Sequence, residues 1–173
     1  MERFDLYDKD MNRLPETNTR GEHSGEGKFH LVVHVWIRND QGEFLIQQRN
    51  KEDDLIPYQW GITGGAVLAG ETSMEGAIRE TKEEIGIVLT PDQLHLQKRY
   101  FIELGYHNYI TDLYLVNENI LLNECKLDTV EVRDVAYKTM AEIKDMISAN
   151  TFWDYERMME RTGYFDLLET SKP

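Results

Sequence analysis

Residues 65–87 read GAVLAGETSMEGAIRETKEEIGI, and this stretch decides which fold the chain is expected to adopt. Within it, Glu80, Glu83 and Glu84 stand at positions i, i+3 and i+4, a spacing that gathers side chains on one face of an α-helix. Carboxylates at this spacing repel one another and destabilise a helix. A divalent cation such as Mg²⁺ or Mn²⁺, which prefers oxygen ligands, would relieve that repulsion. The alternative is an ordinary acidic helix face exposed to water.

The local sequence places this helix directly after a glycine-rich turn. Thr72, followed three residues later by Glu75, has the pattern of a capping box, which predicts that the helix begins just after Thr72. Gly86 suits the left-handed conformation that commonly ends a helix. Gly64 and Gly65 have no Cβ, so a phosphate or a metal ion can approach their backbone closely. The side chains expected to face the core, with the carboxylates on the other side, are Met74, Ala77, Ile78, Thr81 and Ile85.

Seven residues of this stretch together match a known motif. They fill the pattern G-x5-E-x7-R-E-x-x-E-E-x-G and are Gly65, Glu71, Arg79, Glu80, Glu83, Glu84 and Gly86. At average residue usage such a match arises by chance in on the order of one chain in 10⁵. The pattern is the Nudix box, and the chain resembles the Nudix hydrolases, although Thr81 stands where that family normally has an aliphatic residue. The resemblance implies an α/β protein with the Nudix fold, an α/β/α sandwich around a mixed β-sheet.

The resemblance also implies roles for the residues of the box. The expected metal ligands for Mg²⁺ or Mn²⁺ are Glu80, Glu83, Glu84 and the carbonyl of Gly65. The general base is one of these glutamates or a carboxylate from a later loop, and the family varies on this point. Arg79 is expected to orient Glu83 rather than touch the substrate, and Glu71 to support the loop or the carboxylate cluster. The alternative for Arg79 is an ordinary surface charge on the helix.

Four further residues are candidates for binding the substrate. Gly64 belongs to the glycine-rich turn, and Arg49 ends a predicted strand where it would contact a phosphate or remain solvated. Trp60 would either stack on a base or pack beneath the loop, and packing is the favoured interpretation. His107 would reach the cleft from its strand or loop.

The whole chain of residues 1–173 is expected to be one Nudix domain, with an N-terminal hairpin and polar loop in 1–28 and the core in 29–168. The hairpin is a candidate dimer-forming element. Alternation and β-branched content predict strands at residues 30–38, 43–49, 100–102, 110–116 and 130–138. His30 and His34 alternate on one face of the first of these and are expected to be structural. Helices are expected at 139–148 and 151–168, the second packing into the core through Phe152, Trp153, Tyr155, Met158, Met159 and Phe165.

Composition restricts the partners. The net charge is −13, with 19 Lys and Arg against 32 Asp and Glu, which disfavours long nucleic acids but allows a small phosphorylated, nucleotide-derived substrate. The single cysteine, Cys125, excludes an intramolecular disulfide and a multi-cysteine zinc site, and it fits a reducing cytoplasm. No stretch approaches the roughly 20 apolar residues of a membrane span.

The predicted function is a metal-dependent hydrolase that cleaves the phosphoanhydride of a nucleoside diphosphate derivative or a similar small organic pyrophosphate. The order of strand, Trp60, box, strand and C-terminal helices is similar to the branch that includes isopentenyl-diphosphate isomerase. That isomerase needs a cysteine in the loop after the tryptophan, and residues 61–65 contain none. A non-catalytic nucleotide-binding module is the other alternative. Such modules typically lose metal-site glutamates, whereas this chain keeps all three.

Overall fold

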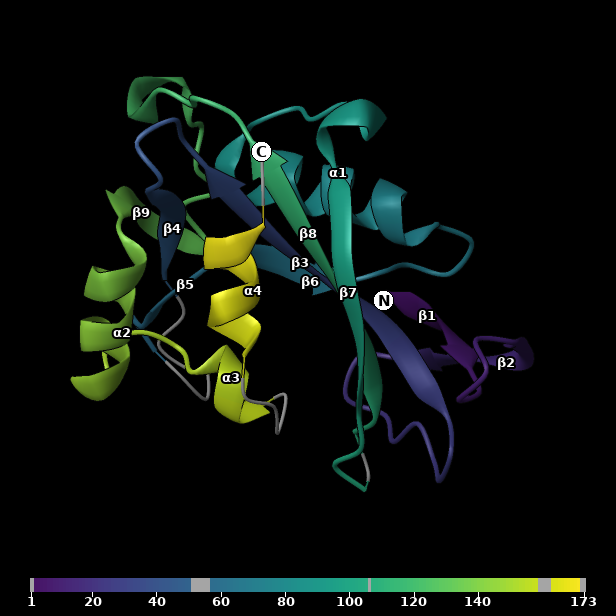
Figure 1. Cartoon of the computed structure of the whole chain (residues 1–173). Coiled ribbons are helices and arrows are strands. Elements are labelled where there is room, and N and C mark those ends of the chain that lie inside the picture. The colour runs from purple at the N-terminus through teal and green to yellow at the C-terminus, as the bar shows by residue number, and fades with distance from the viewer. Residues whose placement is uncertain (1, 51–56, 106, 159–162, 172–173) are drawn as a thin grey trace.

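A computed structural model describes residues 2–50, 57–105, 107–158 and 163–171. Its strands form one mixed sheet built around β3 (Phe29–Arg38) (Figure 1). The other strands are β1 (Arg3–Tyr7), β2 (Arg13–Thr19), β4 (Phe44–Arg49), β5 (Trp60–Gly61), β6 (Thr63–Ala66), β7 (His95–Ile102), β8 (Tyr109–Asn117) and β9 (Val132–Lys138). β3 is parallel to β8 and antiparallel to β1, β4 and β6.

The register of the sheet brings the ends of distant segments together. β6 pairs with β3 so that Gly64 lies opposite His34. β4 pairs with β9, and Arg49 at the end of β4 lies opposite Val132 at the start of β9. Gly64 and Gly65 therefore lie in β6, directly beside the central strand β3. The chain after β4 lies beside the chain before β9.

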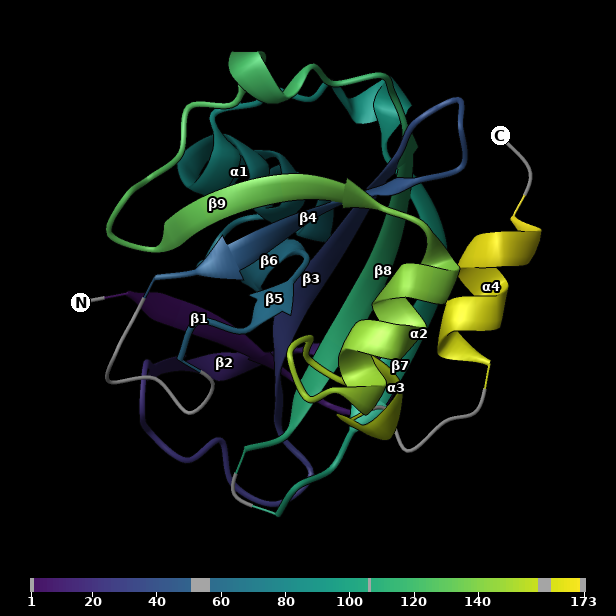
Figure 2. The same ribbon diagram turned by 90° about the vertical axis from the view of Figure 1, so that its left-hand side faces the viewer.

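Helices cover both faces of the sheet. They are α1 (Ser73–Ile85), α2 (Met140–Ser148), α3 (Tyr155–Met158) and α4 (Tyr164–Thr170), with 3₁₀ turns at Pro91–Gln93 and Leu122–Glu124. Figures 1 and 2 place α1 on one side of the sheet and the other three helices on the opposite side. Side chains of β3 alternate accordingly, because Val33 and Val35 pack in one core cluster with Ala77 of α1, whereas Trp36 packs in the other with Tyr164 of α4. The predicted α/β/α sandwich is confirmed.

Two element predictions were wrong. Residues 16–19, predicted as loop, extend β2, where Thr19 pairs with Arg3; an edge strand needs pairing on one side only and tolerates polar side chains on both faces. The single helix predicted over 151–168 is replaced by α3 and α4, because Gly163 has φ 90°, which ends a right-handed helix. Met159 lies outside the described residues. In the described part of the chain, no helix has the length and apolarity to cross a bilayer.

Candidate active site

The box helix begins and ends as its sequence predicts. The Thr72 hydroxyl accepts a hydrogen bond from the Glu75 N–H at 3.2 Å, and the Glu75 carboxylate accepts one from the Thr72 N–H at 2.7 Å. At the other end Gly86 adopts φ 74°, and its N–H donates to the Lys82 carbonyl. The capping box and the terminal glycine are both confirmed, so the register of the carboxylates on α1 is fixed.

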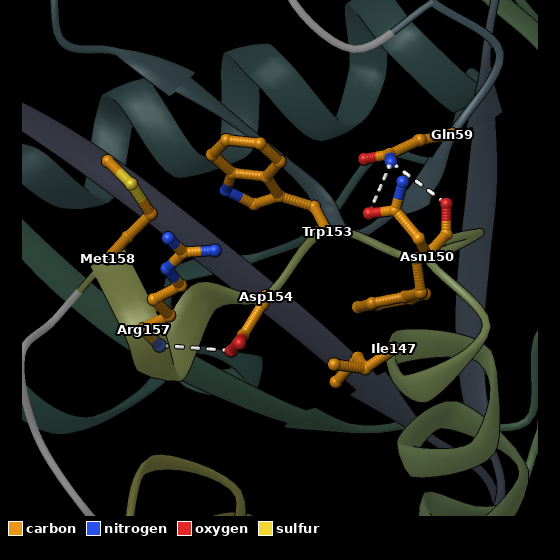
Figure 3. Close-up of a pocket in the computed structure, with 8 residues that line it drawn as sticks. Gln59, Ile147, Asn150, Trp153, Asp154, Arg157 and Met158 are labelled. Atoms are coloured by element: carbon orange, nitrogen blue, oxygen red, sulfur yellow. Dashed lines mark hydrogen bonds between the residues drawn. The ribbon is translucent and has the colours of Figure 1, made fainter.

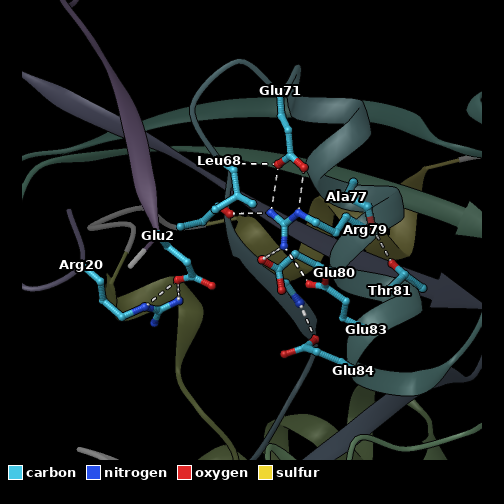
Figure 4. A network of polar contacts seen from close by, with 12 residues as sticks. Glu2, Arg20, Leu68, Glu71, Ala77, Arg79, Glu80, Thr81, Glu83 and Glu84 are labelled. Atoms are coloured by element: carbon cyan, nitrogen blue, oxygen red, sulfur yellow. Dashed lines mark hydrogen bonds and ion pairs between the residues drawn. The ribbon is translucent and has the colours of Figure 1, made fainter. Parts of the chain in front are cut away.

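Arg79 is the centre of a polar network that joins α1 to the preceding loop (Figure 4). Its Nε and Nη2 atoms donate to the two carboxylate oxygens of Glu71 at 2.8 and 3.0 Å. Nη1 donates to Glu80 at 2.8 Å and to Glu83 at 2.9 Å, and Nη2 also donates to the Ala66 carbonyl at 2.9 Å. Burial lowers the pKa of Arg79, but these hydrogen bonds outweigh it and raise the pKa above its ordinary value. The side chain is only 18% exposed, which argues against an ordinary surface charge.

Glu84 faces inward, contrary to the prediction that all three carboxylates of the box face away from the core. It stands seven residues after Ala77 and three after Thr81, so it continues their buried stripe, and it is 6% exposed. Its Oε2 atom accepts hydrogen bonds from Gln47 Nε2 at 2.9 Å and from the Gly64 N–H at 3.1 Å. Burial, followed by the nearby charge of Glu80, raises the pKa of Glu84 to about 8.

Glu80 lies directly against the glycine-rich strand. A Cβ added at Gly65 would lie 2.5 Å from the Glu80 carboxyl carbon, so only glycine leaves room for this side chain. Burial raises the pKa of Glu80; Arg79 opposes the shift, and the charges of Glu83 and Glu131 add to it.

Glu131 is a fourth carboxylate, close enough for its charge to act on Glu80 and Glu84, and no sequence motif points to it. It directly precedes β9, its carbonyl accepts a hydrogen bond from the Asn50 N–H at 2.8 Å, and its charge raises the pKa of both Glu80 and Glu84. The register of β4 with β9 brings it there, and that register depends on pairing between segments some 80 residues apart.

The donor set fits a divalent cation by its chemistry. As they stand, no three His, Cys, Asp or Glu side chains within the described ranges are grouped closely enough to hold a metal ion. Arg79 holds Glu80 and Glu83, while Glu84 turns toward Gln47. Even so, buried carboxylates with raised pKa values, gathered beside a glycine that leaves space for them, form a site that a cation would stabilise.

A cleft of about 160 Å³ opens beside these carboxylates. Its lining residues are Val32, His34, Arg49, Ile62, Gly64, Gly65, Trp153 and Tyr155. Of the predicted substrate-binding residues, Arg49 and Gly64 meet there. Trp60 instead packs against the core cluster, and His107 is exposed on the loop before β8, with its ring 5.3 Å from that of His23. Neither Trp60 nor His107 is among the described residues that line the cleft.

Two aromatic side chains that line the cleft, His34 and Tyr155, are held by hydrogen bonds. His34 Nδ1 lies 2.9 Å from the Tyr164 hydroxyl, and burial lowers the pKa of His34 to about 3, which favours the structural interpretation of this histidine. Tyr155, predicted only as a core residue, accepts a hydrogen bond from the Ile62 N–H at 3.1 Å and packs its ring 4.7 Å from that of His34. The rings of His34 and Tyr155 are therefore held in place next to the glycine-rich strand β6.

A family model described as the NUDIX domain matches residues 28–159. The chain belongs to the Nudix family. An uncharacterized Nudix hydrolase of Listeria innocua is 34% identical over 156 residues, which cover 90% of each chain. Nudix hydrolase 3 of Arabidopsis thaliana is 32% identical over 182 residues, which cover 96% of this chain and 23% of the plant protein. The crystal structure of DR0079 from Deinococcus radiodurans has the same fold, with a TM-score of 0.73, 20% identity, and coverage of 97% of this chain and 98% of that one.

These likenesses confirm the predicted family and fold, and with them a Nudix hydrolase. The relatives do not single out the branch similar to isopentenyl-diphosphate isomerase, so that part stays a prediction.

Proposed function

We propose that this Nudix hydrolase depends on a divalent metal ion and cleaves the diphosphate linkage of a nucleoside diphosphate derivative or a similar small organic pyrophosphate. The observation that carries the proposal is the burial of Glu80 and Glu84 beside Gly65 and Gly64, which raises the pKa of both, with the charge of Glu131 adding to the shifts. Buried carboxyl groups with raised pKa values, next to a cleft that Gly64 and Gly65 line, are a site that a cation and the phosphates accompanying it would stabilise.

The residues that would hold Mg²⁺ or Mn²⁺ are Glu80, Glu83, Glu84 and the carbonyl of Gly65. When bound, a divalent ion offsets the negative charge on the phosphate oxygens and makes a nearby water more acidic. Arg79 positions Glu80 and Glu83 by the hydrogen bonds described above. Beside the glutamates of the box, Glu131 is the later carboxylate proposed to take a proton from the attacking water, because its charge acts on both Glu80 and Glu84.

Arg49 and Gly64 are the residues proposed to receive the phosphates. Arg49 brings a positive charge to a cleft in a protein of net charge −13, and Gly64 presents backbone without a side chain on the same cleft. A local cation of this kind is what allows an acidic protein to bind a small polyphosphate. The substrate roles of Trp60 and His107, and a homodimer through the N-terminal hairpin, stay predictions.

The test is release of phosphate or nucleotide from a panel of nucleoside diphosphates and triphosphates, ADP-ribose, NADH, nucleotide sugars and isopentenyl diphosphate, with Mg²⁺ and with EDTA. We expect cleavage of at least one compound with Mg²⁺ only. Glu83→Gln and Glu84→Gln should abolish it while the circular dichroism spectrum stays that of the wild type. Lys82→Ala, on the exposed side of the same helix, is the matched control and should keep its activity. Undiminished turnover in EDTA, or in both glutamine variants, would overturn the proposal.

A further inference from the structure

Trp153 lines two separate hollows of the molecule. One is the cleft over Gly64 and Gly65, and the other is a cavity of about 320 Å³ between α2 and α3 (Figure 3). Figure 3 shows the indole between Gln59 and Asn150 on one side and Met158 on the other. Trp153 is therefore the residue that a ligand spanning the phosphate cleft and the second cavity would meet in both.

We propose that the second cavity binds the base of a nucleotide-derived substrate, with the indole of Trp153 as the surface on which the base stacks. The inference rests on the proposed function, because it assigns the polyphosphate of the same substrate to the cleft that Trp153 also lines. It assigns to Trp153 a role in choosing the substrate.

The support beneath Trp153 is rigid, as stacking requires. The backbone N–H of Trp153 donates to the Trp60 carbonyl at 2.9 Å, and the backbone N–H of Trp60 donates to the Thr151 carbonyl at 2.8 Å. Phe152, the residue between, forms a parallel bridge with Trp60 and is buried in the core. Trp153 itself is partly exposed and lines the cavity, so its backbone is held in place while part of its side chain stays accessible to a ligand.

The cavity has an apolar floor and a polar edge. Ile147, Phe152 and Met158 supply apolar surface of the kind that a flat ring buries. At the edge, Gln59 Nε2 donates to the Asn150 carbonyl at 3.0 Å, whereas Gln59 Oε1 is buried and has no hydrogen-bond partner among the described residues. In Figure 3 this oxygen points from Gln59 toward Trp153.

The unpaired acceptor Gln59 Oε1 favours a ligand that brings a hydrogen-bond donor to the cavity. Gln59 Oε1 has no donor among the described residues, whereas Asp154 Oδ1, on the same cavity, already accepts the backbone N–H of Arg157 at 2.9 Å. Bases that carry an exocyclic amino group, such as cytosine and adenine, donate to such acceptors, whereas a carbonyl at the same position repels them. An isoprenoid chain would fill the apolar floor but would leave Gln59 Oε1 buried without a partner, which is unfavourable.

Equilibrium binding, measured by titration calorimetry without catalysis, tests the base site on the full chain. We expect CMP to bind more tightly than UMP, and AMP more tightly than IMP, by about fivefold or more, since each pair differs in one amino group. Trp153→Ala should lower the binding affinity for CMP and AMP by on the order of tenfold. Trp153→Phe should keep most of the affinity, and ribose 5-phosphate should bind all three proteins alike. Leu121→Ala, an exposed apolar truncation far from the cavity in sequence, is the control.

The outcomes separate this inference from the proposed function. Base-dependent binding that Trp153→Ala removes supports the base site even if the wild type hydrolyses nothing in the panel. Metal-dependent hydrolysis with unchanged CMP and AMP binding in Trp153→Ala would overturn the base site and leave the hydrolase standing. The base site would also be overturned if Trp153→Ala lost affinity for ribose 5-phosphate as much as for CMP and AMP. Tighter binding of isopentenyl diphosphate than of any nucleotide would overturn it as well.

Discussion

The guanidinium of Arg79 donates two hydrogen bonds, 2.8 and 3.0 Å long, to the two carboxylate oxygens of Glu71. Glu71 also accepts the N–H of Leu68 at 3.0 Å, so this pair ties the loop before α1 to the helix itself. The remaining Nη1 atom of Arg79 reaches both Glu80 and Glu83. One side chain thus sets the position of the loop and of two candidate metal ligands, through a fork that only arginine presents.

Arg79→Lys should therefore lower kcat by about 10- to 100-fold, the usual cost of losing a residue that orients metal ligands. A lysine keeps the charge but has a single ammonium, which cannot hold Glu71 in two places and reach Glu80 and Glu83 as well. Steady-state kinetics with Mg²⁺, together with a Mn²⁺ titration, measure the effect. Lys82→Arg, an exposed exchange on the same helix, should stay within twofold of the wild type. Wild-type kcat in Arg79→Lys would contradict the positioning role.

Signals confined to a few neighbouring residues were predictable from the sequence. Thr72, Glu75 and Gly86 fix the bounds of α1 because a cap and its helix are adjacent in the chain. The spacing of Glu84 from Ala77 and Thr81 is compatible with an inward direction, but its hydrogen-bond partners Gly64 and Gln47 stand 20 and 37 residues earlier and meet it only through the sheet. Charge pattern alone groups Glu84 with the other glutamates, whereas burial separates it from them.

The C-terminal segment was less predictable for a related reason. Aromatic and methionine residues at helical spacing look alike whether they fill the core or line a cavity. Phe152 and Phe165 are core residues as predicted, but Trp153 and Met158 line the second cavity. The break at Gly163 is visible as a glycine, yet a glycine near the end of an apolar run is compatible with one helix or two.

Gly64 and Gly65 should respond differently to the same substitution. A Cβ at Gly65 meets the Glu80 carboxylate, the far end of a long side chain, so Gly65→Ala should cost little stability but displace Glu80 and lower kcat at least tenfold. A Cβ at Gly64 lies 2.2 Å from the backbone carbonyl of Val33, so Gly64→Ala should strain the strand pairing and lower the unfolding free energy by about 1–3 kcal/mol or more. Urea unfolding and kcat separate the two, and identical behaviour of both variants would contradict the assignment.

Asp5 is predicted to support the active site from the N-terminal strand. It is 3% exposed, pairs with Arg13 at 2.8 Å and accepts the N–H of Gly70 at 2.8 Å, next to Glu71 in the loop. Asp5→Ala would leave the N–H of Gly70 without its partner and should destabilise the fold by about 1–3 kcal/mol. Since the loop carries Glu71, kcat should fall as well.

The matched variants for Asp5 separate shape from charge. Asp5→Asn keeps an acceptor oxygen and should recover part of both the stability and kcat. Asp10→Ala removes an exposed carboxylate from the same hairpin and should change neither. Thermal unfolding and kcat measure the set, and an Asp5→Ala protein with wild-type kcat would show that the loop holds its position without β1.

His30 should make the folded protein sensitive to acid. Its ring stacks on Phe4 and lies 5.9 Å from that of Tyr109, and burial, followed by the charges of His107 and Arg20, lowers its pKa to about 4 from an ordinary value of 6.5. Between these two values the unfolded chain binds the proton and the folded chain does not. The contribution of His30 to the unfolding free energy should therefore be constant above pH 6.5 and fall as the pH is lowered toward 4. Glu84, whose pKa burial raises to about 8, acts in the opposite direction in the wild type and in a His30 variant alike.

The expected loss from His30 is up to about 3 kcal/mol, the free-energy equivalent of a shift of roughly 2.5 pKa units. His34, whose pKa burial lowers to about 3, acts in the same direction and is unchanged by a substitution at His30. Urea unfolding at pH 7, 6, 5 and 4.5 should give a shallower decline for His30→Gln than for the wild type, whatever the stability of the variant at pH 7. Carboxylates that titrate below pH 5 contribute to both proteins and cancel in the difference. Parallel declines would mean that His30 is protonated equally in the folded and unfolded states.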